Sequence, residues 1–256
     1  MTIRFRPLVL ALHAVSNSWP YLLAVSPEML ERQLKSLLLR RYRPATAAEA
    51  VGGRGRLLHV TFDDGFRSTL NALPLLERLG IPSTVFVCPA WADRGRLSVP
   101  ELDEESRKFP RELATLDWDQ LRKLRDCGVE IGSHTLTHPH LRRLTDIELA
   151  RELRESRERL ESELERPCRF LSYPFGENDE RVRAAARDAG YVGAFGLPEK
   201  QKPCEPFAVP RIGFYRQDGM IRATLKTSVV RQPVAAFRRA QDRAERARSE
   251  RSHLEP

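Results

Sequence analysis

The sequence predicts an α/β fold in which about seven β-α units form a closed or nearly closed parallel barrel. Short apolar runs alternate with amphipathic helical stretches along most of the 256 residues. Continuously apolar runs are typical of parallel strands buried on both faces, and the stretches between them are long enough to be helical crossovers. About seven such units in roughly 230 residues favour a barrel over a doubly wound open sheet.

Each barrel strand is predicted at one of these apolar runs. The runs are Leu8–His13, Leu57–Phe62, Thr84–Cys88, Val129–Gly132, Phe170–Tyr173, Tyr191–Phe195 and Ala208–Ile212. The first run is too short for a secretory h-region or a membrane span, and no clear cleavage site follows it. We therefore interpret it as a buried strand and expect a cytoplasmic protein without a transmembrane segment.

Capping residues mark where several helices begin. Ser26–Pro27 places a hydroxyl before a proline at the first helical position, and an apolar stripe follows. Asp117 with Gln120, and Thr145 with Glu148, have the spacing of the capping box. We expect helices to start at these three points.

The chain is predicted to form one domain with a terminal extension. Residues 1–232 are expected to form a single barrel, with the principal motifs within 57–196. The polar segment Trp91–Arg111 follows a strand, so we expect it to lie over the active-site end. Residues 233–256 are expected to form a charged helix or a disordered tail, because they alternate Arg with acidic residues.

Composition argues against several classes of function. The formal net charge is +8, but Arg residues alternate with Glu and Asp instead of gathering, so we expect no nucleic-acid partner. The four cysteines lie far apart and form no C-x-x-C pair. This pattern fits a reducing compartment and disfavours a disulfide framework or a zinc site built from cysteines.

The first chemical motif is Thr61–Gly65, directly after the second apolar run. Two adjacent carboxylates, Asp63 and Asp64, at the end of a buried strand are costly unless a cation lies beside them. Gly65 then allows a sharp turn. The same pair could instead cap the N-terminus of the following helix, since Asp is favoured there.

The second motif contains three of the six histidines within seven residues. His134 and His138 are spaced i, i+4, so a helical turn or tight loop would direct both imidazoles the same way. That spacing suits two ligands of a metal such as Zn²⁺. Two histidines and one carboxylate, with positions left open to water, describe a catalytic site. His140 is interpreted as a surface residue or one that supports the pair.

The third motif, Tyr173–Gly176, follows another predicted strand. It could direct a backbone N–H and an aromatic side chain toward the site, although an ordinary β-turn would look the same. Thr61–Gly65, His134–His138 and Tyr173–Gly176 together resemble, in order and spacing, the first three motifs of the NodB-homology polysaccharide deacetylases (carbohydrate esterase family 4). The resemblance covers about Leu57 to Gly196 and implies a distorted (β/α)7-type barrel.

The resemblance also implies a role for each matching residue. Asp63 would be the general base, and Asp64, His134 and His138 would hold one divalent metal ion, which we expect to be Zn²⁺, with Co²⁺ or Ni²⁺ as alternatives. The backbone N–H of Phe175 would bind the oxyanion on the substrate side. The leaving amine would then need a proton from a general acid.

The sequence departs from the common family pattern at the general acid. Most members supply it from a histidine near the C-terminal end of the domain, but this chain has none between His140 and His253. His13 ends the first strand, in a setting that resembles the branch containing poly-N-acetylglucosamine deacetylases, where an N-terminal histidine is the acid. We predict that role for His13; the alternative is a histidine that only shapes the pocket. His59, inside a strand, is expected to be a core histidine.

A second departure is Ser172, where many members carry an arginine that pairs with the catalytic Asp. Arg169 is three residues earlier and would point to the opposite face of the strand. Arg211 on a late strand is the better substitute, because it could orient Asp63 and keep its pKa low on the substrate side of the site. An ordinary surface arginine is the alternative.

These observations predict a metal-dependent hydrolase that removes an N-acetyl group from an amino sugar in a glycan, oligosaccharide or lipid-linked saccharide. The lack of an export signal favours small, nucleotide-linked or lipid-linked substrates; a lipid-linked one would bring peripheral contact with a membrane. Two alternatives keep the scaffold: a deformylase or other amide hydrolase, and a non-catalytic barrel that binds glycan or a partner protein.

Overall fold

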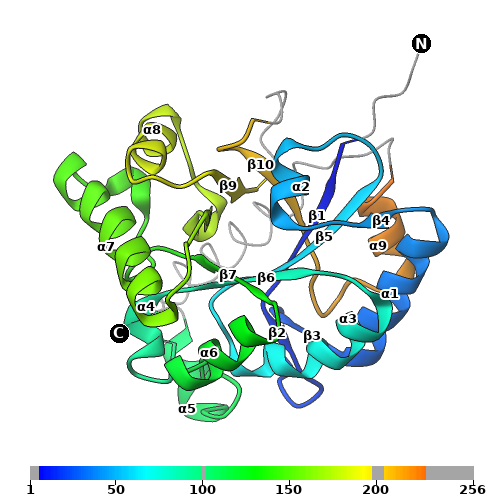
Figure 1. Cartoon of the computed structure of the whole chain (residues 1–256). Coiled ribbons are helices and arrows are strands. Elements are labelled where there is room, and N and C mark those ends of the chain that lie inside the picture. Colours follow the sequence, from blue (N-terminus) through cyan, green and yellow to red (C-terminus); the bar gives the residue numbers. More distant parts are fainter. Residues whose placement is uncertain (1–5, 98, 100–101, 198–204, 229–256) are drawn as a thin grey trace, which may run out of the picture.

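Seven parallel strands close into a barrel in the computed structural model, which describes residues 6–97, 99, 102–197 and 205–228 (Figure 1). In barrel order the strands are β1 (Leu8–Leu12), β10 (Val209–Gly213), β9 (Gly193–Gly196), β8 (Phe170–Ser172), β7 (Glu130–Ser133), β6 (Ser83–Val87) and β5 (Leu57–Phe62). The barrel is closed because β1 pairs with both β10 and β5. The predicted fold class is confirmed, and each strand lies within two residues of its predicted bounds.

The barrel is distorted because its strands pair over unequal lengths. β1 and β5 share five residue pairs, from Leu8↔Leu58 to Leu12↔Phe62, whereas β7 and β8 share the single pair Ser133↔Leu171. A short strand, β4 (Arg43–Pro44), adds to the outside of β5, and β2 (Ala14–Val15) pairs with β3 (Ala24–Val25) beyond the end of β1.

Helices surround the barrel in Figure 1, most of them on its outside. The described helices are α1 (Pro27–Leu39), α2 (Ala47–Gly52), α3 (Leu73–Leu79), α4 (Pro89–Ala92), α5 (Asp103–Lys108), α6 (Trp118–Asp126), α7 (Asp146–Leu164), α8 (Glu180–Asp188) and α9 (Met220–Lys226), with 3-10 turns η1 (Arg67–Ala72), η3 (Leu141–Arg143) and η4 (Pro174–Gly176). The three predicted helix starts are confirmed: Ser26 caps α1, and capping boxes begin α6 and α7.

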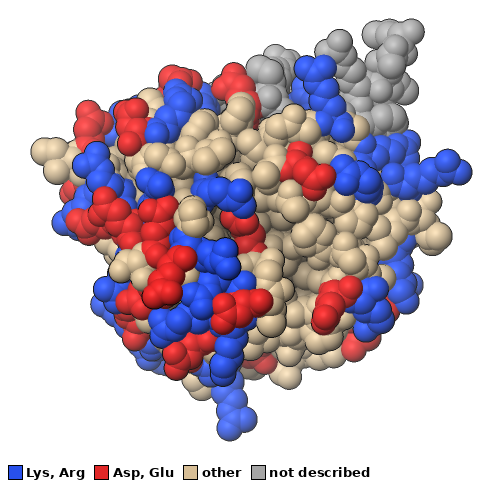
Figure 2. All heavy atoms as spheres, in the orientation of Figure 1, with Lys and Arg blue, Asp and Glu red and all other residues tan. Residues whose placement is uncertain are grey.

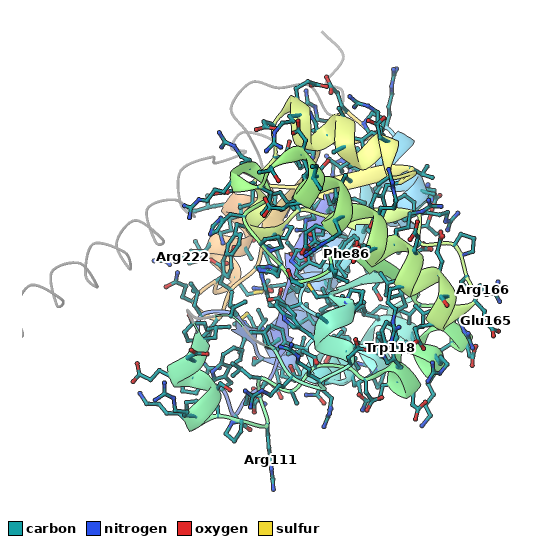
Figure 3. The ribbon with its side chains drawn as sticks, turned by 90° about the vertical axis from the view of Figure 1, so that its left-hand side faces the viewer. Phe86, Arg111, Trp118, Glu165, Arg166 and Arg222 are labelled. Carbon is teal, nitrogen blue, oxygen red and sulfur yellow. The ribbon has the colours of Figure 1, made fainter. Side chains whose placement is uncertain are left out.

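Strand side chains alternate between the barrel interior and the helices. Odd-numbered residues of β1 and even-numbered residues of β6 point inward, so Val9 and Phe86 join an interior cluster completed by Phe170, Phe195 and Val209. Even-numbered residues of β1 pack outward under the helices. Figure 3 shows the labelled Phe86 deep within the molecule, whereas Arg111 and Arg166 project from its surface. Ala47 and Ala50 of α2 pack into the interior cluster and close the barrel at one end.

The insertion Trp91–Arg111 is tied to the other end of the barrel. The segment that returns from it runs beside the turn after β5, where the Leu116 N–H donates to the Gly65 carbonyl (2.8 Å) and the Arg67 N–H to the Ala114 carbonyl (2.8 Å). Trp19 Nε1 donates to Glu105 of α5 (2.8 Å), which links the insertion to the loop after β2. The insertion therefore borders the ends of the strands, as predicted.

No described helix combines the length and the apolar character needed to span a membrane. The expected cytoplasmic location stays a prediction. Figure 2 shows acidic and basic side chains interspersed on the face it presents. Of the four cysteines, Cys88, Cys127 and Cys168 are unpaired in the described part of the chain. Residues 233–256, for which a charged helix or tail was expected, lie outside the described residues.

Candidate metal and catalytic site

The predicted site residues meet at the carboxyl ends of the barrel strands. His13, Asp63 and His134 each come directly after a strand, at an inward-pointing position of its alternation. Arg211 occupies an inward position within β10. Because the strands are parallel, their carboxyl ends share one mouth of the barrel, where the loops of such folds carry their chemistry.

Asp64, His134 and His138 form a compact group of potential metal ligands. The Nε2 atoms of His134 and His138 lie 3.4 and 3.5 Å from Asp64 Oδ1, and one ligand atom from each residue lies within 4.8 Å of the others. Asp64 and His138 adopt left-handed backbone conformations, with φ of 67° and 65°. These turns direct side chains from two separate loops toward one point.

The two histidines present neutral imidazoles to this point. Burial lowers the pKa of both, and for His138 the neighbouring His134 lowers it further. His134 Nδ1–H donates to the Ser172 carbonyl (2.8 Å), which leaves the Nε2 lone pair facing Asp64. The His138 ring packs between Trp91 and Phe175, at centroid distances of 5.2 and 4.8 Å. Hydrogen bonding therefore orients one ring and aromatic packing the other.

Asp64 lacks a partner for its buried charge within the described chain. Its Oδ1 is buried and has no hydrogen-bond donor there. Burial raises the pKa of this carboxyl well above its usual value, and the charge of Asp63 raises it further. A divalent cation would supply the missing positive charge, and two imidazole nitrogens with one carboxylate oxygen are a ligand set that suits Zn²⁺. The residues therefore fit such an ion.

Asp63 is held by a two-pronged ion pair with Arg211. Arg211 donates from Nη1 to Oδ1 (2.7 Å) and from Nη2 to Oδ2 (2.8 Å), and the same guanidinium reaches Thr61 Oγ1 (3.0 Å) and Ser172 Oγ (2.8 Å). Burial alone would raise the pKa of Asp63, but the charge of Arg211 and its hydrogen bonds outweigh burial and hold the pKa well below its usual value. Asp63 is thus ionised and fixed in orientation.

Two alternatives from the sequence are wrong for this pair. Arg211 is only 2% exposed, so it is no ordinary surface arginine. The Asp63–Asp64 pair does not cap the following helix either: η1 begins after Phe66, and no side chain bonds to its N-terminus. Arg169 faces away from the site and pairs with Glu130 (2.9 Å), as its odd offset predicted.

His13 lies partly buried beside Asp63. Burial lowers its pKa to about 4; the charge of Asp63 acts in the opposite direction, and that of Arg211 lowers the pKa further. Its Nδ1 is buried without a hydrogen-bond partner in the described chain. His13 is therefore neutral at pH 7.

The remaining histidines differ in their surroundings. His59 donates from Nδ1 to the Ala45 carbonyl and accepts at Nε2 from Thr84, both at 2.9 Å, so it is a satisfied core histidine. His140 stacks on the Phe175 ring at 3.9 Å and bonds Glu177 at 3.2 Å. It supports the rim of the site outside the ligand group. Phe175 itself lies in η4 with φ of 57°.

Two residues at the site were not predicted from the sequence. Trp91, which is 2% exposed, forms a wall against His138, but in the sequence it is only the first residue of a polar insertion. Glu152 bonds the loop between the two histidines, but it lies in α7 among many Glu and Arg residues of similar spacing. Only a helical-wheel placement of Glu152 on the buried face of α7 could have singled it out.

Comparison with known proteins identifies the family. The family model of polysaccharide deacetylases matches residues 51–194, more than half of the chain. The chain belongs to the polysaccharide deacetylase family. Its match to the curated Bacillus subtilis protein YxkH is 26% identical over 133 residues and covers 52% of this chain and 41% of YxkH. The chain thus spans about two fifths of that relative.

Solved structures share the fold of this polysaccharide deacetylase family member. BC0361, a polysaccharide deacetylase from Bacillus cereus, is 23% identical with a TM-score of 0.69, covering 89% of this chain and 71% of that one. A de-N-acetylase from Aggregatibacter actinomycetemcomitans is 17% identical with a TM-score of 0.70, covering 87% and 99%. At these identities the likeness is one of fold.

Proposed function

We propose that this chain is a metal-dependent hydrolase that removes the N-acetyl group from an amino sugar in a glycan, oligosaccharide or lipid-linked saccharide. The observation that carries the proposal is that two adjacent carboxylates have different surroundings. Asp64 faces two neutral histidines and lacks a described partner, while Asp63 is ionised and held apart by Arg211. Membership of the polysaccharide deacetylase family supports the substrate class.

Asp64, His134 and His138 would hold one divalent ion, with Zn²⁺ expected and Co²⁺ or Ni²⁺ as alternatives. When bound, such an ion lowers the pKa of water and polarises an amide carbonyl. The lowered pKa values of the two histidines favour this role, because a histidine must be neutral to act as a ligand.

Asp63 accepts the proton of the attacking water in this proposal. Its low pKa keeps it ionised across the physiological range, and Arg211 fixes both carboxylate oxygens. Arg211 is buried, so it supports the substrate side of the site through its ion pair with Asp63. The backbone N–H of Phe175, in the turn after β8, would donate to the oxyanion.

His13 returns a proton to the leaving amine. Since His13 is neutral at pH 7, it must first receive from Asp63 the proton that the attacking water gave up. Its position beside Asp63, on the neighbouring strand β1, supports such a transfer. A neutral histidine also adds no positive charge next to the proposed metal position.

The test is acetate release by the Zn²⁺-loaded protein from a panel of N-acetylated amino sugars. The panel contains the monosaccharide, oligomers, and nucleotide-linked and lipid-linked forms, each with an N-formyl counterpart. We expect acetate from at least one substrate and a loss of about 10²–10⁴-fold in kcat for Asp63→Asn, the usual contribution of acid–base catalysis. Asp119→Asn, at an exposed site on α6, should match the unaltered protein. If the unaltered protein and Asp63→Asn hydrolyse the substrates equally slowly, the proposal that this chain is a hydrolase is wrong.

A further inference from the structure

The loop that carries both histidines has a backbone that needs support. Thr135 and His138 have φ of 68° and 65°, in the left-handed region. A β-branched residue such as Thr is disfavoured there, and such conformations persist only where surrounding structure holds them. The loop must therefore receive stabilising contacts from elsewhere in the fold.

Glu152 supplies the contacts to the middle of this loop. Its carboxylate on α7 is 5% exposed. Oε2 accepts from the backbone N–H groups of Leu136 and Thr137, both at 2.9 Å, and Oε1 accepts from Thr137 Oγ1 at 2.7 Å. Two consecutive peptide groups between the histidines are thus fixed by a single side chain.

A second contact from the same helix supports the start of the loop. Ser156, one helical turn after Glu152, accepts from Ser133 Oγ (2.9 Å), which in turn accepts from the Thr135 N–H (3.0 Å). Within the loop, the His138 N–H donates to Thr135 Oγ1 (3.1 Å). These bonds connect α7 to the backbone on both sides of Leu136.

The charge of Glu152 also acts near the ligands. It contributes to raising the pKa of Cys88, after burial and the charge of Asp64. The Cys88 thiol donates to the His134 carbonyl (3.0 Å), so it lies directly beneath the first ligand. Glu152 is thus a buried carboxylate near Cys88, whose thiol bonds the backbone of His134.

We infer that Glu152 is a positioning residue that holds His134 and His138 in the arrangement that binds the metal ion. The inference rests on the proposed function, because it requires that these histidines be ligands. Glu152 acts through the loop and touches neither ligand ring. Without its carboxylate, Leu136 and Thr137 lose their acceptor and the loop can relax toward a less strained backbone.

Three variants separate the geometry of Glu152 from its charge. Glu152→Ala removes both. Glu152→Gln keeps an acceptor oxygen for the two N–H groups and can bond Thr137 through its amide. Glu155→Ala is the matched control, because Glu155 lies on the same helix three residues later but is exposed. For each, Zn²⁺ affinity is measured by competition with a chromophoric chelator, and the visible absorption of the Co²⁺ form reports ligand geometry.

We expect Glu152→Ala to bind Zn²⁺ about 10–100-fold more weakly and to show an altered Co²⁺ spectrum, as for other residues that orient metal ligands. Glu152→Gln should recover most of the affinity and the original spectrum, and Glu155→Ala should match the unaltered protein. Folding is checked by circular dichroism. If Glu152→Ala does not fold, Thr137→Val, which removes only the Oε1 contact, should still weaken binding.

Unaltered Zn²⁺ affinity and Co²⁺ spectrum in folded Glu152→Ala would overturn the inference while leaving the proposed function intact. If Glu152→Ala does not fold, unaltered Zn²⁺ affinity and Co²⁺ spectrum in Thr137→Val would overturn the inference in the same way. Failure of the unaltered protein to bind either metal would instead overturn the proposed function. The two failures are therefore distinguishable in one titration series.

Discussion

Arg211 connects three strands through a single guanidinium. It bonds Thr61 on β5, Asp63 just beyond it, and Ser172 on β8, all inside the barrel. The Ser172 hydroxyl accepts a hydrogen bond from this arginine, which comes from β10. One buried positive charge thus joins β5, β8 and β10 around Asp63.

A double-mutant cycle tests the strength of this ion pair. Arg211→Met should lower the free energy of unfolding by about 3–5 kcal/mol, because it leaves the buried Asp63 charge without its partner. Adding Asp63→Asn to Arg211→Met should recover part of that loss, since no charge then remains uncompensated. Urea unfolding of the two single variants and the double variant gives the coupling. Strictly additive losses would contradict the pair as described.

His59 gives a residue-level prediction for pH. Its pKa is lowered from the usual 6.5 to about 4, mainly by burial. The unfolded chain therefore binds a proton at His59 between pH 6.5 and 4 while the folded protein does not, so stability falls as the pH drops through this window, by up to about 3 kcal/mol. His59→Gln can keep both hydrogen bonds. In urea unfolding measured across this pH range, the free energy of unfolding of this variant should depend less steeply on pH, by the equivalent of one proton. An unchanged slope would count against a neutral His59.

Residue roles were harder to predict than residue positions. The positions of His13, Asp63 and His134 at or just after strand ends could be identified because each strand has a clear apolar pattern. The Arg211–Asp63 pair could be suggested because the family resemblance implies an arginine beside the catalytic Asp and Ser172 cannot supply it. The role of Trp91 could not, and Glu152 could be singled out only as a charged residue on the buried face of α7, because both roles depend on packing between elements far apart in the sequence.

Alternation along the strands is the element-scale basis of the site. The same period of two that buries Val9 and Phe86 directs His13, Asp63 and Arg211 inward. Strand bounds could therefore be predicted well from apolar runs, and with them the face on which each side chain lies. Loop conformations such as that of 134–138 could not, because left-handed residues at Thr135 and His138 depend on bonds from α7.

Gly132 on β7 tests how closely the interior is packed. A Cβ at this position would lie 2.5 Å from two atoms of the Phe86 ring and 3.0 Å from the Phe170 carbonyl oxygen. Gly132→Ala should therefore lower the free energy of unfolding by about 1–3 kcal/mol, the usual effect of overpacking. Gly52→Ala is the control, because a Cβ there meets nothing within 4 Å. Equal stability of both variants would show a looser interior than described.

At the scale of the whole molecule, barrel closure brings the site together. Asp64, His134 and Arg211 are distant in sequence, and they meet because β5, β7, β8 and β10 belong to one closed sheet. The count of about seven apolar runs favoured a closed or nearly closed barrel over an open sheet. The match of the family model to residues 51–194 agrees with it but omits His13 and Arg211, which lie outside that range.

Metal binding should stabilise the whole fold. A ligand that binds only the folded protein adds about 2.7 kcal/mol at a hundredfold excess over its Kd. Zn²⁺ should therefore raise the melting temperature of the metal-free protein, and a chelator should reverse the change. Asp64→Asn should show neither response, and Asp119→Asn on α6 should respond like the unaltered protein.

The most direct measurement is the stoichiometry of Zn²⁺ bound after equilibrium dialysis of metal-free protein, determined by elemental analysis. The account predicts one ion per chain for the unaltered protein and for Glu155→Ala, and none at the same free Zn²⁺ concentration for His134→Ala and His138→Ala. Undiminished binding by those two variants, or no uptake by the unaltered protein, would contradict the metal site.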